Sequence, residues 1–80
     1  MTVRIDRGNG PEDVVVLPGA VCDWEDAHGG TPITEAASST SNLVELAWLQ
    51  VRADDPSTPD LATFRRSLRD VEPIDTTDPQ

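Results

Sequence analysis

One stretch of the chain dominates its pattern of hydrophobic and polar positions. Residues 42–53 form the only long run that is dense in apolar side chains. Apolar residues recur there at steps of three or four along three rows, which predicts a helix that is apolar around most of its circumference. Asn42 and Glu45 have the spacing of a capping box, and this places the start of the helix at residue 42. A helix of this kind is normally buried on several sides, so we expect it to form the core.

Two strands are predicted before this helix. Residues 2–6 alternate between apolar and polar side chains, and residues 12–17 contain a β-branched run that ends at Pro18. The segment 7–11 between them is rich in Gly and Asn, which accept the positive φ angles that tight loops require. The pattern therefore predicts an antiparallel hairpin of residues 2–6 and 12–17. Because an isolated hairpin is marginally stable in water, its apolar side must pack on a helix.

A short helix is predicted at about 19–28. Val21 and Trp24 share one face of this helix, and acidic residues occupy the other face. Gly29 is available for the left-handed position that commonly follows the end of a helix. Residues 31–41 are rich in Thr, Ser and Ala, so most of this segment is predicted to be a loop.

A third helix is predicted after Pro56, with Thr58 as its N-cap and Pro59 at its first position. Its apolar residues recur at steps of three, four and three, and they are Leu61, Phe64, Leu68 and Val71. From residue 73 onward the composition is typical of a disordered acidic tail.

Together these elements predict an α+β fold in which an N-terminal antiparallel β-hairpin packs on a three-helix unit. Residues 1–72 form a single small domain, and residues 73–80 form a disordered acidic C-terminal tail. A domain of this size has a core worth about 3–5 kcal/mol, so contacts with a partner or a second copy are expected to add stability. The central helix is either fully enclosed by the domain or has one open flank that a partner closes. The hairpin and the other two helices are expected to cover the central helix only thinly, which favours the second arrangement.

The net charge of −9 restricts the classes of partner. Nucleic-acid binding through phosphates needs a basic face, which this composition does not supply. Acidity is compatible with solubility, with attraction to a basic protein, or with mimicry of nucleic-acid charge, and solubility is the general explanation. No segment approaches the roughly 20 apolar residues of a membrane span, and the N-terminus has no signal-peptide core. A single cysteine gives no disulfide framework. We therefore expect a soluble protein of the cytoplasm.

The residue types of catalytic sites are scarce. His28 and Cys22 are the only residues of their kinds, and six helical positions between them place them on opposite faces. His28 is expected to have a capping or surface role, and Cys22 is expected to be a small buried residue. The carboxylates lack the spacing and the glycine of a calcium loop, and there is no phosphate-binding glycine loop. The sequence predicts neither a catalytic nor a metal site, no cofactor, and no enzyme activity.

Half of the six basic residues lie close together near the third helix, and they are Arg65, Arg66 and Arg69. The favoured interpretation is local pairing with Asp70, Glu72 and the acidic residues 54–55. The alternative is a contact with an acidic segment of a partner. Aromatic residues are also typical anchors of protein interfaces. The candidate partner-binding residues are Trp24, Leu46, Trp48, Leu49, Phe64, Arg65 and Arg69.

Several segments occur in an order that resembles a known family. These are the Trp-Glu-Asp-Ala-His-Gly end of a helix at 24–29, the Leu-Ala-Trp-Leu-x-x-Arg helix at 46–52, the Pro-Asp-Leu-Ala-Thr-Phe segment at 59–64 and the Val-Glu-Pro-Ile segment at 71–74. This order resembles the tail assembly chaperones of long-tailed bacteriophages, particularly those that infect actinobacteria. The resemblance covers roughly residues 13–74.

The resemblance implies a non-catalytic chaperone in the host cytoplasm that binds the tape measure protein. That protein is long, helical and hydrophobic, and it must stay soluble until tail tube subunits polymerise around it. The implied partner is the tape measure protein, with the tail tube protein as a second candidate, and with no nucleic acid and no membrane. Two alternatives remain: an acidic inhibitor or DNA mimic that binds a basic enzyme, and a small structural virion part such as a head-to-tail adaptor.

Overall fold

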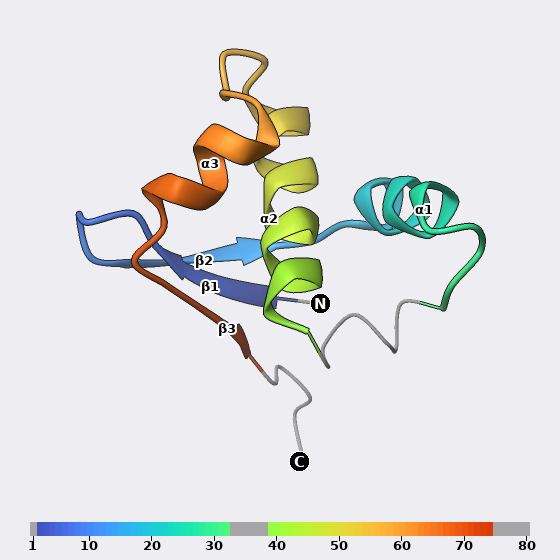
Figure 1. Ribbon diagram of the computed structural model, residues 1–80, viewed down its shortest axis with the longest axis horizontal. Coiled ribbons are helices and arrows are strands. Elements are labelled where there is room, and N and C mark those ends of the chain that lie inside the picture. The colour runs from blue at the N-terminus through green and yellow to red at the C-terminus, as the bar shows by residue number, and fades with distance from the viewer. Residues whose placement is uncertain (1, 33–38, 75–80) are drawn as a thin grey trace.

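The computed structural model describes residues 2–32 and 39–74 (Figure 1). Its elements, in chain order, are β1 (Thr2–Asp6), β2 (Pro11–Val15), α1 (Pro18–Ala27), α2 (Thr40–Asp54), α3 (Leu61–Ser67) and β3 (Asp70–Ile74). The strands form one antiparallel sheet, and the helices pack together with it. The predicted α+β class is confirmed.

The N-terminal strand lies in the middle of the sheet, because the strand order is β2-β1-β3. Val3 and Ile5 of β1 are fully buried. Since successive side chains of a strand point to opposite faces, Val3 and Ile5 define the face that carries the core, and Arg4 points to the other face. One face of the sheet is therefore apolar and covered, and the other is polar.

The third strand was not predicted from the sequence. Val71 lies opposite Ile5, and Pro73 lies opposite Val3. The assignment of Val71 to a helix was wrong, and so was the assignment of residues 73 and 74 to a disordered tail. Residues 75–80, which the same prediction covered, lie outside the described residues. Pro73 is compatible with a strand because β3 is at the edge of the sheet.

The central helix starts earlier than the capping-box pattern predicted. It begins at Thr40 after the N-cap Ser39, whose side chain makes no capping bond. Asn42 lies inside the helix, and the carboxylate of Glu45 contacts His28 instead of the helix start. The predicted capping box is therefore wrong. Of the predicted loop 31–41, residues 33–38 lie outside the described part of the chain.

The third helix starts later than predicted. Its N-cap is Asp60 and not Thr58. The hydroxyl of Thr58 donates to the carbonyl of Asp55 at 2.6 Å, and the carboxylate of Asp55 accepts from the N–H of Ser57 at 3.0 Å. These bonds close a turn directly before the helix, so the Thr58 side chain is not available as a cap.

The end of α1 has the geometry that the two glycines predict. Gly29 has φ of 68° and Gly30 has φ of 88°. The N–H of Gly30 donates to the carbonyl of Glu25 at 2.7 Å, and the N–H of Gly29 donates to the carbonyl of Asp26 at 3.3 Å. This is the bond pair of a Schellman motif, and it confirms Gly29 as the left-handed residue after the helix.

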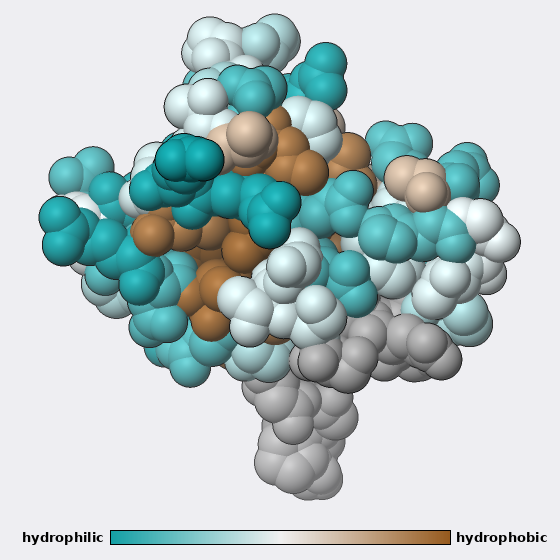
Figure 2. Space-filling view, in the orientation of Figure 1, coloured by the Kyte–Doolittle hydropathy of each residue, from teal (hydrophilic) through white to brown (hydrophobic). Residues whose placement is uncertain are grey.

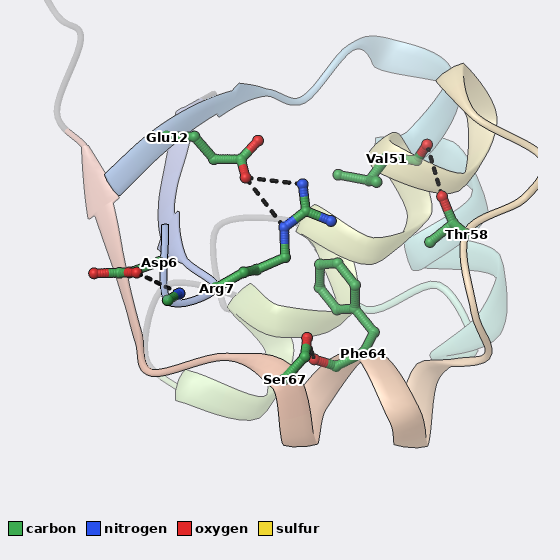
Figure 3. Close-up of polar contacts among 8 residues, drawn as sticks. Asp6, Arg7, Glu12, Val51, Thr58, Phe64 and Ser67 are labelled. Carbon is green, nitrogen blue, oxygen red and sulfur yellow. Dashed lines mark hydrogen bonds and ion pairs between the residues drawn. The ribbon is translucent and has the colours of Figure 1, made fainter. Parts of the chain in front are cut away.

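The core surrounds α2, which contacts α1, α3 and all three strands. The buried apolar side chains of the core lie in, or directly next to, every element except β3. They are Val3, Ile5, Val14, Val16, Ala20, Trp24, Leu43, Val44, Leu46, Ala47 and Phe64. The prediction that the central helix forms the core is confirmed. The loop after β1 completes the cover: the guanidinium of Arg7 lies 5.9 Å from the ring centre of Phe64 and donates to Glu12 at 2.8 Å (Figure 3).

Candidate functional site

The predicted partner-binding residues fall into three groups. Trp24 and Leu46 are fully buried, and Phe64 is 1% exposed, so a partner cannot contact these side chains unless the core opens. Trp48 and Leu49 are half-buried on α2. Arg65 and Arg69 are exposed, which leaves both guanidinium groups within reach of a partner. The structure therefore does not join all seven residues into one surface.

Three residues of α2 form the first candidate surface, the α2 flank, and they are Trp48, Leu49 and Arg52. The Trp48 Nε1 donates to the carbonyl of Pro59 at 2.8 Å, so the segment before α3 covers one edge of the indole. The guanidinium of Arg52 lies 5.1 Å from the ring centre and covers another part. Arg52 is exposed, whereas Leu43, Ala47 and Gln50 are buried. One flank of α2 thus faces solvent and carries partly exposed apolar atoms.

A second candidate surface, the arginine hollow, lies between α3 and β3. It encloses about 340 Å³ and is lined by Thr40, Val44, Arg65, Leu68, Arg69, Asp70 and Val71. Figure 2 shows hydrophobic surface bordered by hydrophilic atoms on the face where Figure 1 shows α3 and β3. Among the described residues, the ion pairs are Arg4–Asp13, Arg7–Glu12 and His28–Glu45. The favoured interpretation, local pairing of Arg65, Arg66 and Arg69 with nearby acids, is therefore wrong for this part of the chain.

Another hollow, the β2 groove, lies between β2 and the C-terminal half of α2. It encloses about 470 Å³ and is lined by Arg7, Glu12, Asp13, Val14, Val15, Leu17, Gln50, Val51, Asp54 and Asp55. Val15 is 57% exposed and Leu17 is 53% exposed, and they are the large apolar side chains that the described residues leave exposed. None of the predicted partner-binding residues lines this groove.

The uncovered face of the sheet is rich in carboxylates. Residues directly opposite each other in an antiparallel pair point to the same face. Arg4 lies opposite Asp13 and Glu72, and the next outward position of β1, Asp6, lies opposite Asp70. Arg4 donates to Asp13 at 2.8 Å. This face therefore carries four carboxylates, of which Asp13 contacts the guanidinium of Arg4.

Three exposed carboxyl groups in the described part of the chain have a lowered pKa, and they are Asp13, Asp55 and Asp60. We call them the acid-sensitive carboxylates. Arg4 lowers the pKa of Asp13 mainly through its hydrogen bond. The hydroxyl and N–H of Ser57 lower the pKa of Asp55, and the hydroxyl of Thr63 lowers the pKa of Asp60. Each carboxylate is stabilised by a hydrogen bond that favours its charged form.

His28 connects α1 to α2. It is the C-cap residue of α1. Its ring stacks on Trp24 with centroids 4.2 Å apart, and its Nε2 lies 2.6 Å from the Glu45 Oε1. His28 thus contacts Trp24 of α1 with the face of its ring and Glu45 of α2 with its Nε2 atom. The indole Nε1 of Trp24 is buried and finds no acceptor among the described residues.

Cys22 is exposed, so the prediction of a buried cysteine was wrong. The buried residues of α1 are Ala20 and Trp24, and Cys22 lies between them in sequence on the solvent side. Within residues 2–32 and 39–74, no three His, Cys, Asp or Glu side chains gather as a metal site would require.

Gln50 is a buried polar residue that the sequence reasoning did not select. It is 4% exposed. Its Oε1 accepts from the N–H of Leu17 at 2.8 Å, and its Nε2 donates to Asp54 Oδ2 at 3.2 Å. It therefore ties the segment after β2 to α2. The available signal was its spacing of seven from Leu43 and three from Ala47, which places it on the buried side of the helix.

No protein-family model, no curated protein and no solved structure matches this chain. No helix in the described part is long and apolar enough to cross a bilayer. What the candidate surfaces can bind therefore follows from their own geometry and charge.

Proposed function

We propose that this protein is a non-catalytic phage tail assembly chaperone, which acts in the host cytoplasm and binds an apolar helix of the tape measure protein. The observation that supports the proposal is the α2 flank, where Trp48 and Leu49 are partly exposed on a helix whose other sides are buried. The proposal assigns recognition to the three-helix unit that the N-terminal hairpin supports.

The chemistry of the α2 flank suits an amphipathic helix. Such helices are bound through apolar side chains at helical spacing that settle on an apolar surface. Tryptophan and arginine are enriched among the residues that dominate binding energy at interfaces, and here Arg52 lies over Trp48. A net charge of −9 adds electrostatic repulsion between complexes, which keeps a bound hydrophobic segment from aggregating.

Co-expression with the tape measure protein tests this function. The tape measure protein is expected to move into the soluble fraction and to co-purify with the chaperone. A Leu49→Ser variant with Arg52→Gln is expected to lose most of this effect, because it removes exposed apolar and cationic contacts from the flank. Ala62→Ser is the matched control, since Ala62 is exposed on α3 away from the flank. A folded protein that leaves the tape measure protein insoluble contradicts the proposal.

A second candidate function follows from the carboxylates on the open face of the sheet. Their arrangement around Arg4 favours an acidic inhibitor or DNA mimic that occupies the basic site of an enzyme. Such binding weakens as salt rises, and neutralising Asp70 and Glu72 together is expected to weaken it further. A structural virion part is distinguished from both by its presence in purified particles, from which a chaperone is absent.

A further inference from the structure

The two edges of the sheet differ in their ability to accept another strand. β2 and β3 each pair only with β1 among the described residues, so each has an edge without a strand partner. Pro73 lies in the interior of β3 and has no N–H to donate. A proline at this position is a common device that makes an edge unsuitable for pairing. In β2 the only proline is Pro11, the first residue, so Glu12 to Val15 keep their backbone donors and acceptors.

The most exposed large apolar side chains of the described chain lie at the end of β2 and directly after it. Val15 and Leu17 are each more than half exposed. Both line the β2 groove, together with Val14 and Val51 from β2 and α2. Exposed apolar side chains beside an unpaired strand edge form a template for strand addition, in which backbone bonds give affinity and side-chain pockets give specificity.

The charges around the groove indicate what kind of strand fits. Four of its lining residues are acidic, and they are Glu12, Asp13, Asp54 and Asp55, whereas Arg7 is its only basic lining residue. A second copy of the chain, paired through the same strand, would bring Glu12 and Asp13 of the two copies together, and like charges opposite each other destabilise a strand pair. A segment that carries both basic and apolar residues matches the carboxylates as well as Val15 and Leu17.

We propose that the edge of β2 binds an extended basic and apolar segment of a partner protein, which adds to the sheet as a fourth strand. Neutral backbone bonds to β2 hold the segment, its apolar side chains contact Val15 and Leu17, and its basic side chains face the carboxylates of the groove. This surface is separate from the α2 flank, so the proposal does not depend on the tail assembly function.

The binding test uses three blocked synthetic peptides. The first, Lys-Val-Lys-Val-Thr-Val-Lys, combines basic and apolar residues; the second replaces every Lys by Glu; the third replaces the central Val of the first by Pro. Titration calorimetry at low salt is expected to show binding of the first peptide and at least about tenfold weaker binding of the other two, because like charge or a missing donor opposes pairing. Equal binding of the proline peptide overturns strand addition, and equal binding of the Glu peptide overturns the charge match.

Two variants locate the site. Leu17→Ser removes an exposed apolar contact and is expected to weaken binding of the first peptide about threefold or more, a loss typical of a buried apolar contact. Glu12→Gln combined with Asp54→Asn is expected to weaken it about fivefold at low salt and less at high salt. The matched control is Asp23→Asn with Asp26→Asn, which makes the same charge change on α1 and is expected to change affinity less than about twofold. An equal loss in the control overturns the assignment to the groove.

Amide hydrogen exchange distinguishes strand pairing from charge attraction alone. Binding of the first peptide is expected to slow exchange in residues 12–15 selectively, because strand pairing protects backbone N–H groups. Protection elsewhere, with residues 12–15 unchanged, overturns the proposal. A dimer in sedimentation experiments without peptide that Leu17→Ser dissociates makes a second copy the occupant and overturns it as well.

Discussion

Replacing Gln50 with glutamate is expected to destabilise the protein, although it changes only one heavy atom of α2. The substitution keeps the shape of the side chain and the oxygen that accepts from the N–H of Leu17 at 2.8 Å. It removes the Nε2 donor and puts a carboxylate oxygen 3.2 Å from the carboxylate of Asp54. The new charge is also nearly buried, since Gln50 is 4% exposed.

The magnitude follows from the distance and the exposure. Two like charges at this separation repel by about 1 kcal/mol in water and about 5 kcal/mol at an effective dielectric constant of 20. Because Asp54 is exposed, the repulsion lies toward the lower end of this range. The burial of the introduced carboxylate adds a further cost to the folded state. We expect the free energy of unfolding to fall by about 2–3 kcal/mol at pH 7. In a domain of this size each kcal/mol lowers Tm by about 4–8 °C.

The sign of the pH dependence is fixed by the same geometry. Burial and the neighbouring charge raise the pKa of the introduced carboxyl in the folded state above its unfolded value. The destabilisation is therefore present at neutral pH and diminishes as pH falls through the raised folded pKa, disappearing below the unfolded value of about 4.3. Urea unfolding of both proteins, followed by circular dichroism at pH 7 and at pH 5, measures the difference in free energy of unfolding.

Asp54→Asn is the control for this argument. In the natural protein it is expected to cost less than about 0.5 kcal/mol, because Asp54 is exposed and its bond to Gln50 is long. In the Gln50→Glu protein it removes the repulsion and is expected to restore at least about 1 kcal/mol, a coupling that a double-mutant cycle isolates. A cost of Gln50→Glu below about 0.5 kcal/mol, or the absence of any rescue, refutes the reasoning.

Three further outcomes are expected in unfolding experiments. Gly19→Ala stabilises α1 by about 0.5–1 kcal/mol, because helix propensity improves and the space around the new methyl is free. Gly29→Ala costs about 1–2 kcal/mol, because Gly29 needs its positive φ. Equal effects of the two substitutions contradict this reasoning. Stability falls as pH drops below about 4, because the acid-sensitive carboxylates are then protonated. Asp13→Asn makes this fall shallower, and an unchanged slope contradicts the lowered pKa of Asp13. His28→Ala and Glu45→Ala show a coupling of about 0.5–1.5 kcal/mol in a double-mutant cycle, and strict additivity rules out their hydrogen bond as a link between the helices.

Much of the fold could be predicted because local patterns and tertiary contacts agree there. The dense apolar rows of residues 42–53 predict a helix that the sheet and the other helices can cover on several sides, and α2 is that helix. The glycines after α1 adopt the backbone angles that only glycine reaches easily. In both cases one local property is sufficient to determine the outcome.

The errors have a common physical origin, because at those places a distant contact decides between local alternatives. Leu68 and Val71 continue a helical spacing, yet pairing with β1 draws Val71 into a strand. Glu45 has the spacing of a capping residue, yet His28 lies within hydrogen-bonding distance of its carboxylate. Pairing between residues some 65 positions apart cannot be read from the periodicity of either segment.

The candidate site was harder to predict than the fold. Apolar and aromatic residues attract attention in a sequence, but Trp24, Leu46 and Phe64 are used inside the core. Val15 and Leu17 belong to an apolar run that resembles a buried strand, and their exposure depends on β2 being at the edge of the sheet. Strand order is a property of the whole domain, so the β2 groove could be recognised only in three dimensions.

The central place of β1 has a consequence for how the protein is made. The strand synthesised first needs both of its neighbours, and β3 is the last described element of the chain. During translation β1 and β2 can pair early, but the other edge of β1 stays open until residue 74 has left the ribosome. Such long-range pairing slows folding, because a long loop must close before the contact stabilises the chain. Folding of this sheet is therefore expected to finish only after β3 has been synthesised, and a chain that stops before β3 exposes the central strand of its own sheet.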